Sequence, residues 1–258
     1  MLAIIASICR SLGFLTRLPI NKRWYDRSYL PSDDAASFPI AGFLIGLFGA
    51  AFFLIAIFLN LGNLVAAIIS IIAIIFLTGA LHEDGLSDTF DGFFAPKNRD
   101  QRLEIMKDSR IGVFGALSLI LSILLKIALL NNLSTQFSVS CAIIALIGAE
   151  TISRAAMIWL WYHSPFARSN GVAVAAGAPT QIMIRNGLLI SAFLLFLLIV
   201  PFFGLIHFII AVLLTMFAAF LFMRLCQNKI DGITGDCLGA LQQISVLAFL
   251  IGVSISYI

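Results

Sequence analysis

Long apolar runs alternate with a few short polar segments along this chain, and the pattern predicts an all-α, polytopic bundle of transmembrane helices. A helix needs about 20 predominantly apolar residues to cross the hydrocarbon core of a bilayer. Seven runs meet this requirement, over residues 39–59, 62–80, 113–131, 138–161, 187–204, 205–223 and 238–257. The first two runs, and the fifth and sixth, have very short connectors and are predicted to form helical hairpins. The first 20 residues hold a shorter apolar stretch interrupted by arginine, which is typical of an interfacial or re-entrant segment, with an eighth span as the alternative.

The composition supports the membrane class and adds nothing that calls for a second domain. Of the 258 residues, 61% are hydrophobic and only 11% are charged, whereas soluble domains are about half apolar and about a quarter charged. We therefore treat residues 1–258 as one integral membrane domain, with lipid around it and with a homo-oligomer left open. The net charge of +3 lies at the ends of apolar runs and does not indicate a nucleic-acid partner.

Basic residues predict the orientation of the bundle. Nearly all Lys and Arg precede the first run or lie in every second connector, while the connectors near residues 61, 135 and 203 hold none. Lys and Arg near span ends are retained in the cytoplasm. The pattern predicts a multi-pass protein of the cytoplasmic (inner) membrane, with its charged segments and any active site on the cytoplasmic face. Within the first run, Gly42, Gly46 and Gly49 form a small-xxx-small stripe that favours close helix packing.

One polar segment, residues 82–112, carries seven carboxylates and is the strongest candidate for chemistry. If the second helix continues past Ala80, then Asp84, Asp88 and Asp91 stand at i, i+4 and i+7 on one helical face. Three carboxylates so close repel one another, and a divalent cation would neutralise them. Oxygen ligands suit Mg²⁺ or Mn²⁺, and Asp108 could complete the set. The alternative is a solvated acidic face paired with neighbouring Lys and Arg side chains.

Basic side chains near this segment are candidate phosphate ligands, because arginine binds phosphate oxygens bidentately and lysine acts as a point charge. The candidates are Lys107, Arg110, Arg17 and Arg154. For Arg154, a mutually neutralising pair with Glu150 at i, i+4 is an equal alternative. Lys126 is interpreted as a snorkelling side chain.

A second polar cluster, KIDGITGDCLGA, opens the last run. Gly232 and Gly235 predict a flexible turn that could receive phosphate, and Asp236 would lie near the N-terminus of the last helix. Asp236 is either a helix cap or a metal ligand. His82, at the start of the acidic segment, is either a general base or a polar residue at the membrane boundary.

Six segments together resemble the cobalamin synthase family, the adenosylcobinamide-GDP ribazoletransferases. The segments are FLTRLP, FPIAGFLIG, GALHEDGLSDTFDGF, RLEIMKDSRIGVFG, SRAAM and GITGDCLGA, and they extend over nearly the whole chain. The resemblance implies an Mg²⁺-dependent transferase that joins adenosylcobinamide-GDP to α-ribazole or its 5′-phosphate and releases GMP. It agrees with the chemistry expected from the residues, in which Asp84, Asp88, Asp91 and His82 are catalytic candidates and metal is held by the aspartates.

Two other readings stay open from the sequence. DGLSDTFDG is analogous to the aspartate motif of the CDP-alcohol phosphotransferases, and a prenyltransferase would also use an aspartate-bound diphosphate. An ion-coupled transporter is the alternative from a different class, but transporters place ionisable groups near the bilayer midplane. Here only Glu150 and Arg154 are expected near that depth.

Overall fold

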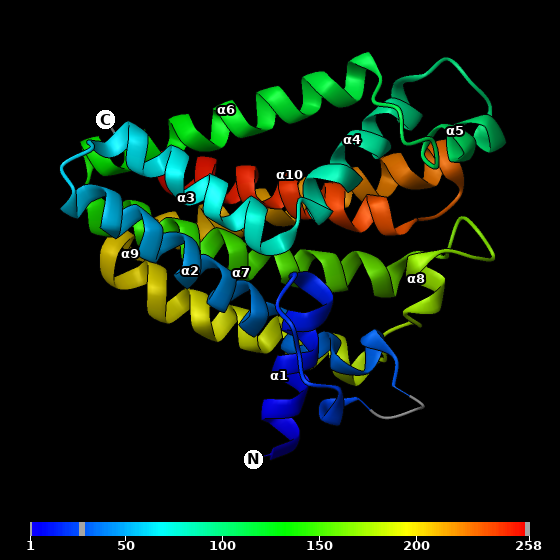
Figure 1. Cartoon of the computed structure of the whole chain (residues 1–258), viewed down its shortest axis with the longest axis horizontal. Helices are drawn as coiled ribbons and strands as arrows, with labels where there is room; N and C mark the ends of the chain where they lie inside the picture. Colours follow the sequence, from blue (N-terminus) through cyan, green and yellow to red (C-terminus); the bar gives the residue numbers. More distant parts are fainter. Residues whose placement is uncertain (1, 26–28, 256–258) are drawn as a thin grey trace.

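In the computed structural model, which describes residues 2–25 and 29–255, the apolar runs form helices that lie side by side along one axis (Figure 1). The long helices are α2 (Phe38–Phe58), α3 (Asn63–Thr78), α6 (Val113–Gln136), α7 (Val139–His163), α9 (Gln181–Ile230) and α10 (Gly235–Ser254). Shorter elements are α1 (Leu2–Leu15), η1 (Lys22–Trp24), η2 (Pro31–Ser37), α4 (Leu81–Phe94), α5 (Arg99–Ile105) and α8 (Val172–Ala175). The prediction of an all-α bundle is confirmed.

Two helices form the centre of the bundle. In their most apolar stretches α7 and α10 are 83% and 78% buried, compared with 22% for α6 and α9. A helix buried on all sides belongs to the interior, whereas the apolar outer faces of α6 and α9 suit contact with lipid. The predicted glycine stripe of α2 packs as expected. A Cβ on Gly42 would overlap the backbone carbonyl of Glu150, and one on Gly46 would lie 2.7 Å from the Cα of Ile147 on α7.

The seven predicted spans lie on fewer continuous helices. Within residues 2–25 and 29–255, five helices are long and apolar enough to cross a membrane, or six when the bent pair α3–α4 counts as one span. The predicted runs 187–204 and 205–223 are both parts of α9, which is broken at Gly204 (φ 82°, ψ 168°). The end of the last predicted run, residues 256–257, lies outside the described residues.

The two arms of α9 nevertheless fold back on each other as the predicted hairpin. The ring centroids of Phe196 and Phe208 are 6.0 Å apart, whereas 12 residues of straight helix would separate them by about 18 Å. Residues of both arms also line one cavity beside α7. The φ of +82° at Gly204 is a conformation that glycine adopts without strain, and this break allows the reversal.

One correction concerns the helix that carries the aspartates. It does not continue from α3, because the chain breaks at Gly79 (φ 66°) and Ala80 (φ 59°), and α4 turns by 88° from α3. Gly79 ends α3 in the left-handed conformation that is common at helix C-termini. α1 is also short: its 14 residues span about 21 Å, less than the hydrocarbon core. It crosses the direction of the bundle (Figure 1), which agrees with the interfacial interpretation.

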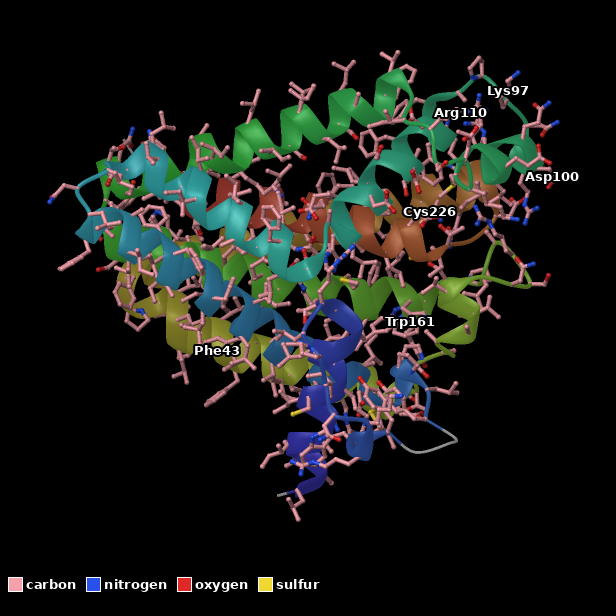
Figure 2. The ribbon with its side chains drawn as sticks, viewed as in Figure 1. Phe43, Lys97, Asp100, Arg110, Trp161 and Cys226 are labelled. Carbon is pink, nitrogen blue, oxygen red and sulfur yellow. The ribbon has the colours of Figure 1, made fainter. Side chains whose placement is uncertain are left out.

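The polar connections gather at one end of the bundle. α4, α5 and α8 lie together there (Figure 1), and Lys97, Asp100 and Arg110 project from the same end (Figure 2). The connector between α2 and α3 lies at the opposite end. The charge asymmetry predicted from the sequence is therefore an asymmetry between the two ends of the bundle.

Candidate active site

α4 presents two different faces. Asp84, Asp88 and Asp91 are exposed or partly exposed, while His82 and Glu83 are only 1% and 6% exposed. The three aspartates therefore share one helical face, as predicted, although α4 is a separate helix. Within residues 2–25 and 29–255, no Lys or Arg forms an ion pair with any of these three aspartates. This finding weighs against the alternative of a solvated face neutralised by neighbouring cations.

The first turn of α10 lies directly against α4. A Cβ on Gly85 would lie 2.7 Å from the backbone carbonyl oxygen of Asp236, and one on Gly239 would lie 3.3 Å from the Cα of His82. This close crossing brings Asp236 into electrostatic contact with Asp84 and Asp88. Two polar segments separated by about 150 residues in the sequence thus form one acidic surface.

Asp236 is not the N-cap of α10, so the capping interpretation is wrong. Thr234 is the N-cap: its Oγ1 accepts a hydrogen bond from the backbone N–H of Cys237 at 3.4 Å. The same hydroxyl donates to Oδ2 of Asp236 at 3.1 Å. Thr234 therefore caps the helix, and Oδ1 of Asp236 takes no part in this hydrogen bond. The role of Asp236 as a metal ligand stays a prediction.

Asp91 has different surroundings from Asp84 and Asp88. Its two carboxylate oxygens accept hydrogen bonds from the backbone N–H groups of Gly112 and Gly115, at 2.7 and 2.8 Å. These groups belong to the N-terminus of α6, where unpaired N–H groups and the helix dipole favour an anion. Asp91 thus joins α4 to α6, and its role as a metal ligand or catalytic group stays a prediction.

Asp108 lies in the turn before α6 and pairs with Arg110 at 2.6 Å. Hydrogen bonds from the Arg110 guanidinium and backbone hold the pKa of the Asp108 carboxyl below its usual value. Because Asp108 and Arg110 are paired with each other, this ion pair must break before Asp108 can bind a metal or Arg110 can bind phosphate as predicted. Lys107 is exposed beside it.

Two other predicted phosphate ligands lie elsewhere. Arg17 follows α1 and covers the α3–α4 break: its backbone N–H donates to the Leu77 carbonyl at 2.8 Å, and its side chain fills the space beside Gly79. Arg154 is fully buried and forms an ion pair with Glu150. The neutralising pair that the sequence offered for Arg154 is therefore present.

Arg168 is a cation that the sequence analysis missed. It lies in the loop after α7, and its positive charge acts on both Asp88 and Asp236. Its Nη2 donates to the Leu103 carbonyl at 2.8 Å, which fixes the guanidinium against α5. The signal in the sequence was weak, because Arg168 is one of several cations in polar connectors, with no motif around it.

A short backbone pairing carries Arg168 to the acidic surface. Ala167 donates to the Ile233 carbonyl, and Ile233 donates to the Pro165 carbonyl, each at 2.9 Å. A Cβ on Gly232 would lie 2.5 Å from the Pro165 carbonyl oxygen, so this glycine is required for the approach. Gly235, by contrast, has ordinary space around it. The predicted turn is therefore packed at Gly232, and phosphate binding by either glycine stays a prediction.

The donor set suits a weakly caged metal ion. In the part of the chain that the structure describes, no three His, Cys, Asp or Glu side chains are close enough to hold a metal by themselves. Mg²⁺ usually binds through one or two carboxylates, several waters and the phosphates of a substrate. Asp84, Asp88 and Asp236 offer such carboxylates, so the residues fit an ion that is completed by a phosphorylated ligand.

Comparisons with known proteins identify the family. The family model for cobalamin-5-phosphate synthase matches residues 7–254. The chain belongs to the cobalamin-5-phosphate synthase family. Proteins named adenosylcobinamide-GDP ribazoletransferase from Brucella ovis, Brucella canis and Brucella abortus are each 45% identical over 251 residues, covering 96% of both chains. No solved structure matches this chain.

The match to the cobalamin-5-phosphate synthase family confirms the resemblance seen in the sequence. It extends over α4, the loop with Arg168 and the start of α10, so every part of the acidic surface lies within the matched residues.

Proposed function

We propose that this protein joins adenosylcobinamide-GDP to α-ribazole, or to α-ribazole 5′-phosphate, with release of GMP in a Mg²⁺-dependent reaction. The observation that carries the proposal is the convergence of Asp84, Asp88 and Asp236 with Arg168 at one end of the bundle, in a chain 45% identical to proteins named for this transfer. Mn²⁺ is the alternative ion, because it prefers the same oxygen ligands.

The chemistry is a displacement at phosphorus. A ribose hydroxyl oxygen of α-ribazole attacks the phosphorus nearer the corrin, the bond from that phosphorus to the bridging oxygen breaks, and GMP leaves with this oxygen. The hydroxyl proton passes to a base. Arg168, whose charge acts on Asp88, would bind the diphosphate and stabilise charge on the departing GMP. A bound Mg²⁺ would neutralise the diphosphate and the charge that develops on the leaving group.

An aspartate is the better candidate for the base than His82. Asp84 and Asp88 lie on the accessible face of α4, whereas His82 is 1% exposed and lies beneath α10. A general base must come within hydrogen-bonding distance of the proton that it removes. We assign this role to Asp84 or Asp88 and keep His82 as a prediction from the sequence.

We further propose that the protein resides in the cytoplasmic membrane, with the acidic surface at the cytoplasmic end and lipid around α6 and α9. The excess of Lys and Arg at this end supports the orientation. A water-soluble, nucleotide-linked corrin would then reach the site from the cytoplasm without crossing the bilayer.

The test is a transferase assay on protein purified in detergent or nanodiscs. Adenosylcobinamide-GDP, α-ribazole and Mg²⁺ should yield GMP and a cobalamin, and EDTA should abolish the reaction. Asp88→Ala should lower turnover by about 100-fold or more, by analogy with removal of a single group that stabilises developing charge. Asp100→Ala is the matched control, because Asp100 is 85% exposed on α5.

The two acceptors are compared by kcat/KM in the same assay. No product from folded, metal-supplied protein would refute the proposal and direct the assay to CDP-alcohol and prenyl diphosphate donors.

A further inference from the structure

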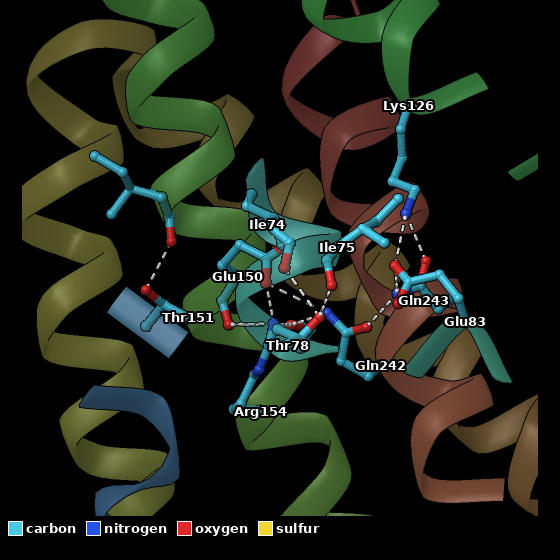
Figure 3. Close-up of polar contacts among 12 residues, drawn as sticks. Ile74, Ile75, Thr78, Glu83, Lys126, Glu150, Thr151, Arg154, Gln242 and Gln243 are labelled. Atoms are coloured by element: carbon cyan, nitrogen blue, oxygen red, sulfur yellow. Dashed lines mark hydrogen bonds and ion pairs between the residues drawn. The ribbon is translucent and has the colours of Figure 1, made fainter. Parts of the chain in front are cut away.

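Behind the acidic surface, a second set of charged and polar side chains is buried inside the bundle. Glu83 is 6% exposed, Lys126 is 4% exposed and Gln243 is 3% exposed, and they come from α4, α6 and α10. The snorkelling interpretation of Lys126 is therefore wrong. Its Nζ points inward, donates to Oε1 of Gln243 at 2.5 Å and lies 3.7 Å from Oε1 of Glu83 (Figure 3).

The network continues across the bundle to α7. Nε2 of Gln243 donates to Oε1 of Glu83 at 3.0 Å and to Oε1 of Gln242 at 2.8 Å. Gln242 in turn donates to Ser153 at 3.2 Å, next to the Glu150–Arg154 pair. Four helices are thus connected through side chains that carry two positive and two negative charges.

Glu83 joins this network to α4, the helix that carries Asp84 and Asp88. Glu83 precedes Asp84, so a rotation of α4 that moved Asp84 and Asp88 away from α10 would also withdraw Glu83 from Lys126 and Gln243. That motion would leave charged groups unpaired in the interior, which is strongly unfavourable. The left-handed turn at Gly79 and Ala80 holds the start of α4, and Asp91 holds its other end against α6. The Glu83 network adds side-chain links from α4 to α6 and α10 in the interior.

We propose that Glu83, Lys126 and Gln243 are positioning residues that fix the rotation of α4, so that Asp84 and Asp88 face Asp236. The functional importance of that alignment rests on the proposed function. The alignment itself is a geometric claim, and it is tested without any reaction.

The test measures how closely α4 and α10 approach by chemical crosslinking. In a background without native cysteines, Asp88→Cys and Asp236→Cys are joined by a short bis-thiol reagent, and the rate is followed by mass spectrometry. Glu83→Gln and Lys126→Met should each slow crosslinking about fivefold or more, because each leaves one buried charge without its partner. The double variant Glu83→Gln/Lys126→Met restores neutrality and should return most of the rate.

Two further variants keep the test decisive. Gln243→Leu removes the link to α10 but leaves Glu83 and Lys126 paired with each other. It should therefore destabilise the fold less than the single charge variants, and it should also slow crosslinking. Glu104→Gln, on the exposed side of α5, is the control and should leave the rate unchanged. If folded Glu83→Gln and Gln243→Leu proteins crosslink at the same rate as the Glu104→Gln control, the proposal is overturned.

A parallel transferase assay with native cysteines separates the two claims. If the positioning role and the proposed function both hold, kcat falls in Glu83→Gln and recovers in the double variant, while KM for α-ribazole changes little. If crosslinking responds as expected but the unaltered protein makes no cobalamin, the positioning role stands and the proposed function fails.

Discussion

Aspartates spaced identically on one helix have different surroundings in this protein. Asp84 and Asp88 lie near the like charge of Asp236. Both carboxylate oxygens of Asp91, by contrast, accept hydrogen bonds from backbone N–H groups at the start of α6. The first arrangement is costly without a cation, and the second is favourable by itself. We therefore propose that the same residue type serves chemistry at Asp84 and Asp88, while the hydrogen bonds of Asp91 join α4 to α6.

This difference predicts opposite effects of matched amide substitutions. Asp91→Asn should lower the free energy of unfolding by about 1–2 kcal/mol, because the amide offers one acceptor oxygen to two N–H groups at a helix end. Asp84→Asn should leave stability nearly unchanged and lower turnover. Thermal unfolding in detergent and initial rates of GMP release measure the two effects. A variant of Asp84 that unfolds as readily as Asp91→Asn would contradict the division.

Arg168 is predicted to bind substrate phosphate. Arg168→Met should lower kcat/KM for adenosylcobinamide-GDP by about 100-fold, the usual scale for loss of one group that stabilises transition-state charge. Arg168→Lys should recover part of this loss, since lysine retains the charge but not the bidentate geometry. Arg185→Met, at an exposed position of α9, is the control. Equal activity of the methionine variants at both positions would exclude Arg168 from the site.

At the scale of elements, hydropathy predicted the long helices well and their interruptions poorly. The start of α2 and of α7 each lies within one residue of the predicted boundary, because apolar runs and lengths determine a membrane helix. The break before α4 depends on two left-handed residues, of which only Gly79 is a recognisable signal. The site was predicted in the same uneven way. Helical spacing predicted that Asp84, Asp88 and Asp91 share one face. The positions of Arg168 and of the Glu83–Lys126 pair depend on long-range packing that no local pattern encodes.

The α3–α4 break yields a prediction about stability. Ala80 has φ +59°, where a side chain costs about 1–2 kcal/mol and glycine costs much less. After allowing for the greater freedom of glycine in the unfolded chain, Ala80→Gly should stabilise the protein by about 0.5–1 kcal/mol. Ala80→Val should destabilise it, since a β-branched side chain tolerates this conformation least. Melting temperatures in the same detergent give the comparison, and a lower melting temperature for the glycine variant would contradict the assigned backbone conformation.

At the scale of the whole molecule, the bundle has one charged end and one nearly uncharged end. The charged end carries the acidic surface, α5 and the loop with Arg168, while the opposite end carries the α2–α3 connector. Such polarity is what the retention of Lys and Arg in the cytoplasm produces during insertion. Substrate entry, chemistry and product release can then all occur on one side of the membrane.

The orientation is tested by labelling single cysteines in a background without native cysteines. Asn60→Cys, in the α2–α3 connector, should react with a membrane-impermeant maleimide in intact cells. Asp100→Cys, on α5, should react only after the membrane is permeabilised. The reverse pattern would place the acidic surface outside and refute the proposed localisation, while labelling of both in permeabilised cells controls for accessibility.

The buried pair of Glu83 and Lys126 gains its shared amide partner late in synthesis, because Gln243 lies on α10. Lys126 and its acceptor Gln243 are 117 residues apart, and Gln243 lies 160 residues after Glu83. At translation rates of about 5–20 residues per second, the ribosome takes roughly 6 to 23 seconds between Lys126 and Gln243. Throughout that interval, the charges of Glu83 and Lys126 lack the amide side chain that bridges them in the folded protein. A chain that stops before α10 therefore lacks both the amide bridge and Asp236.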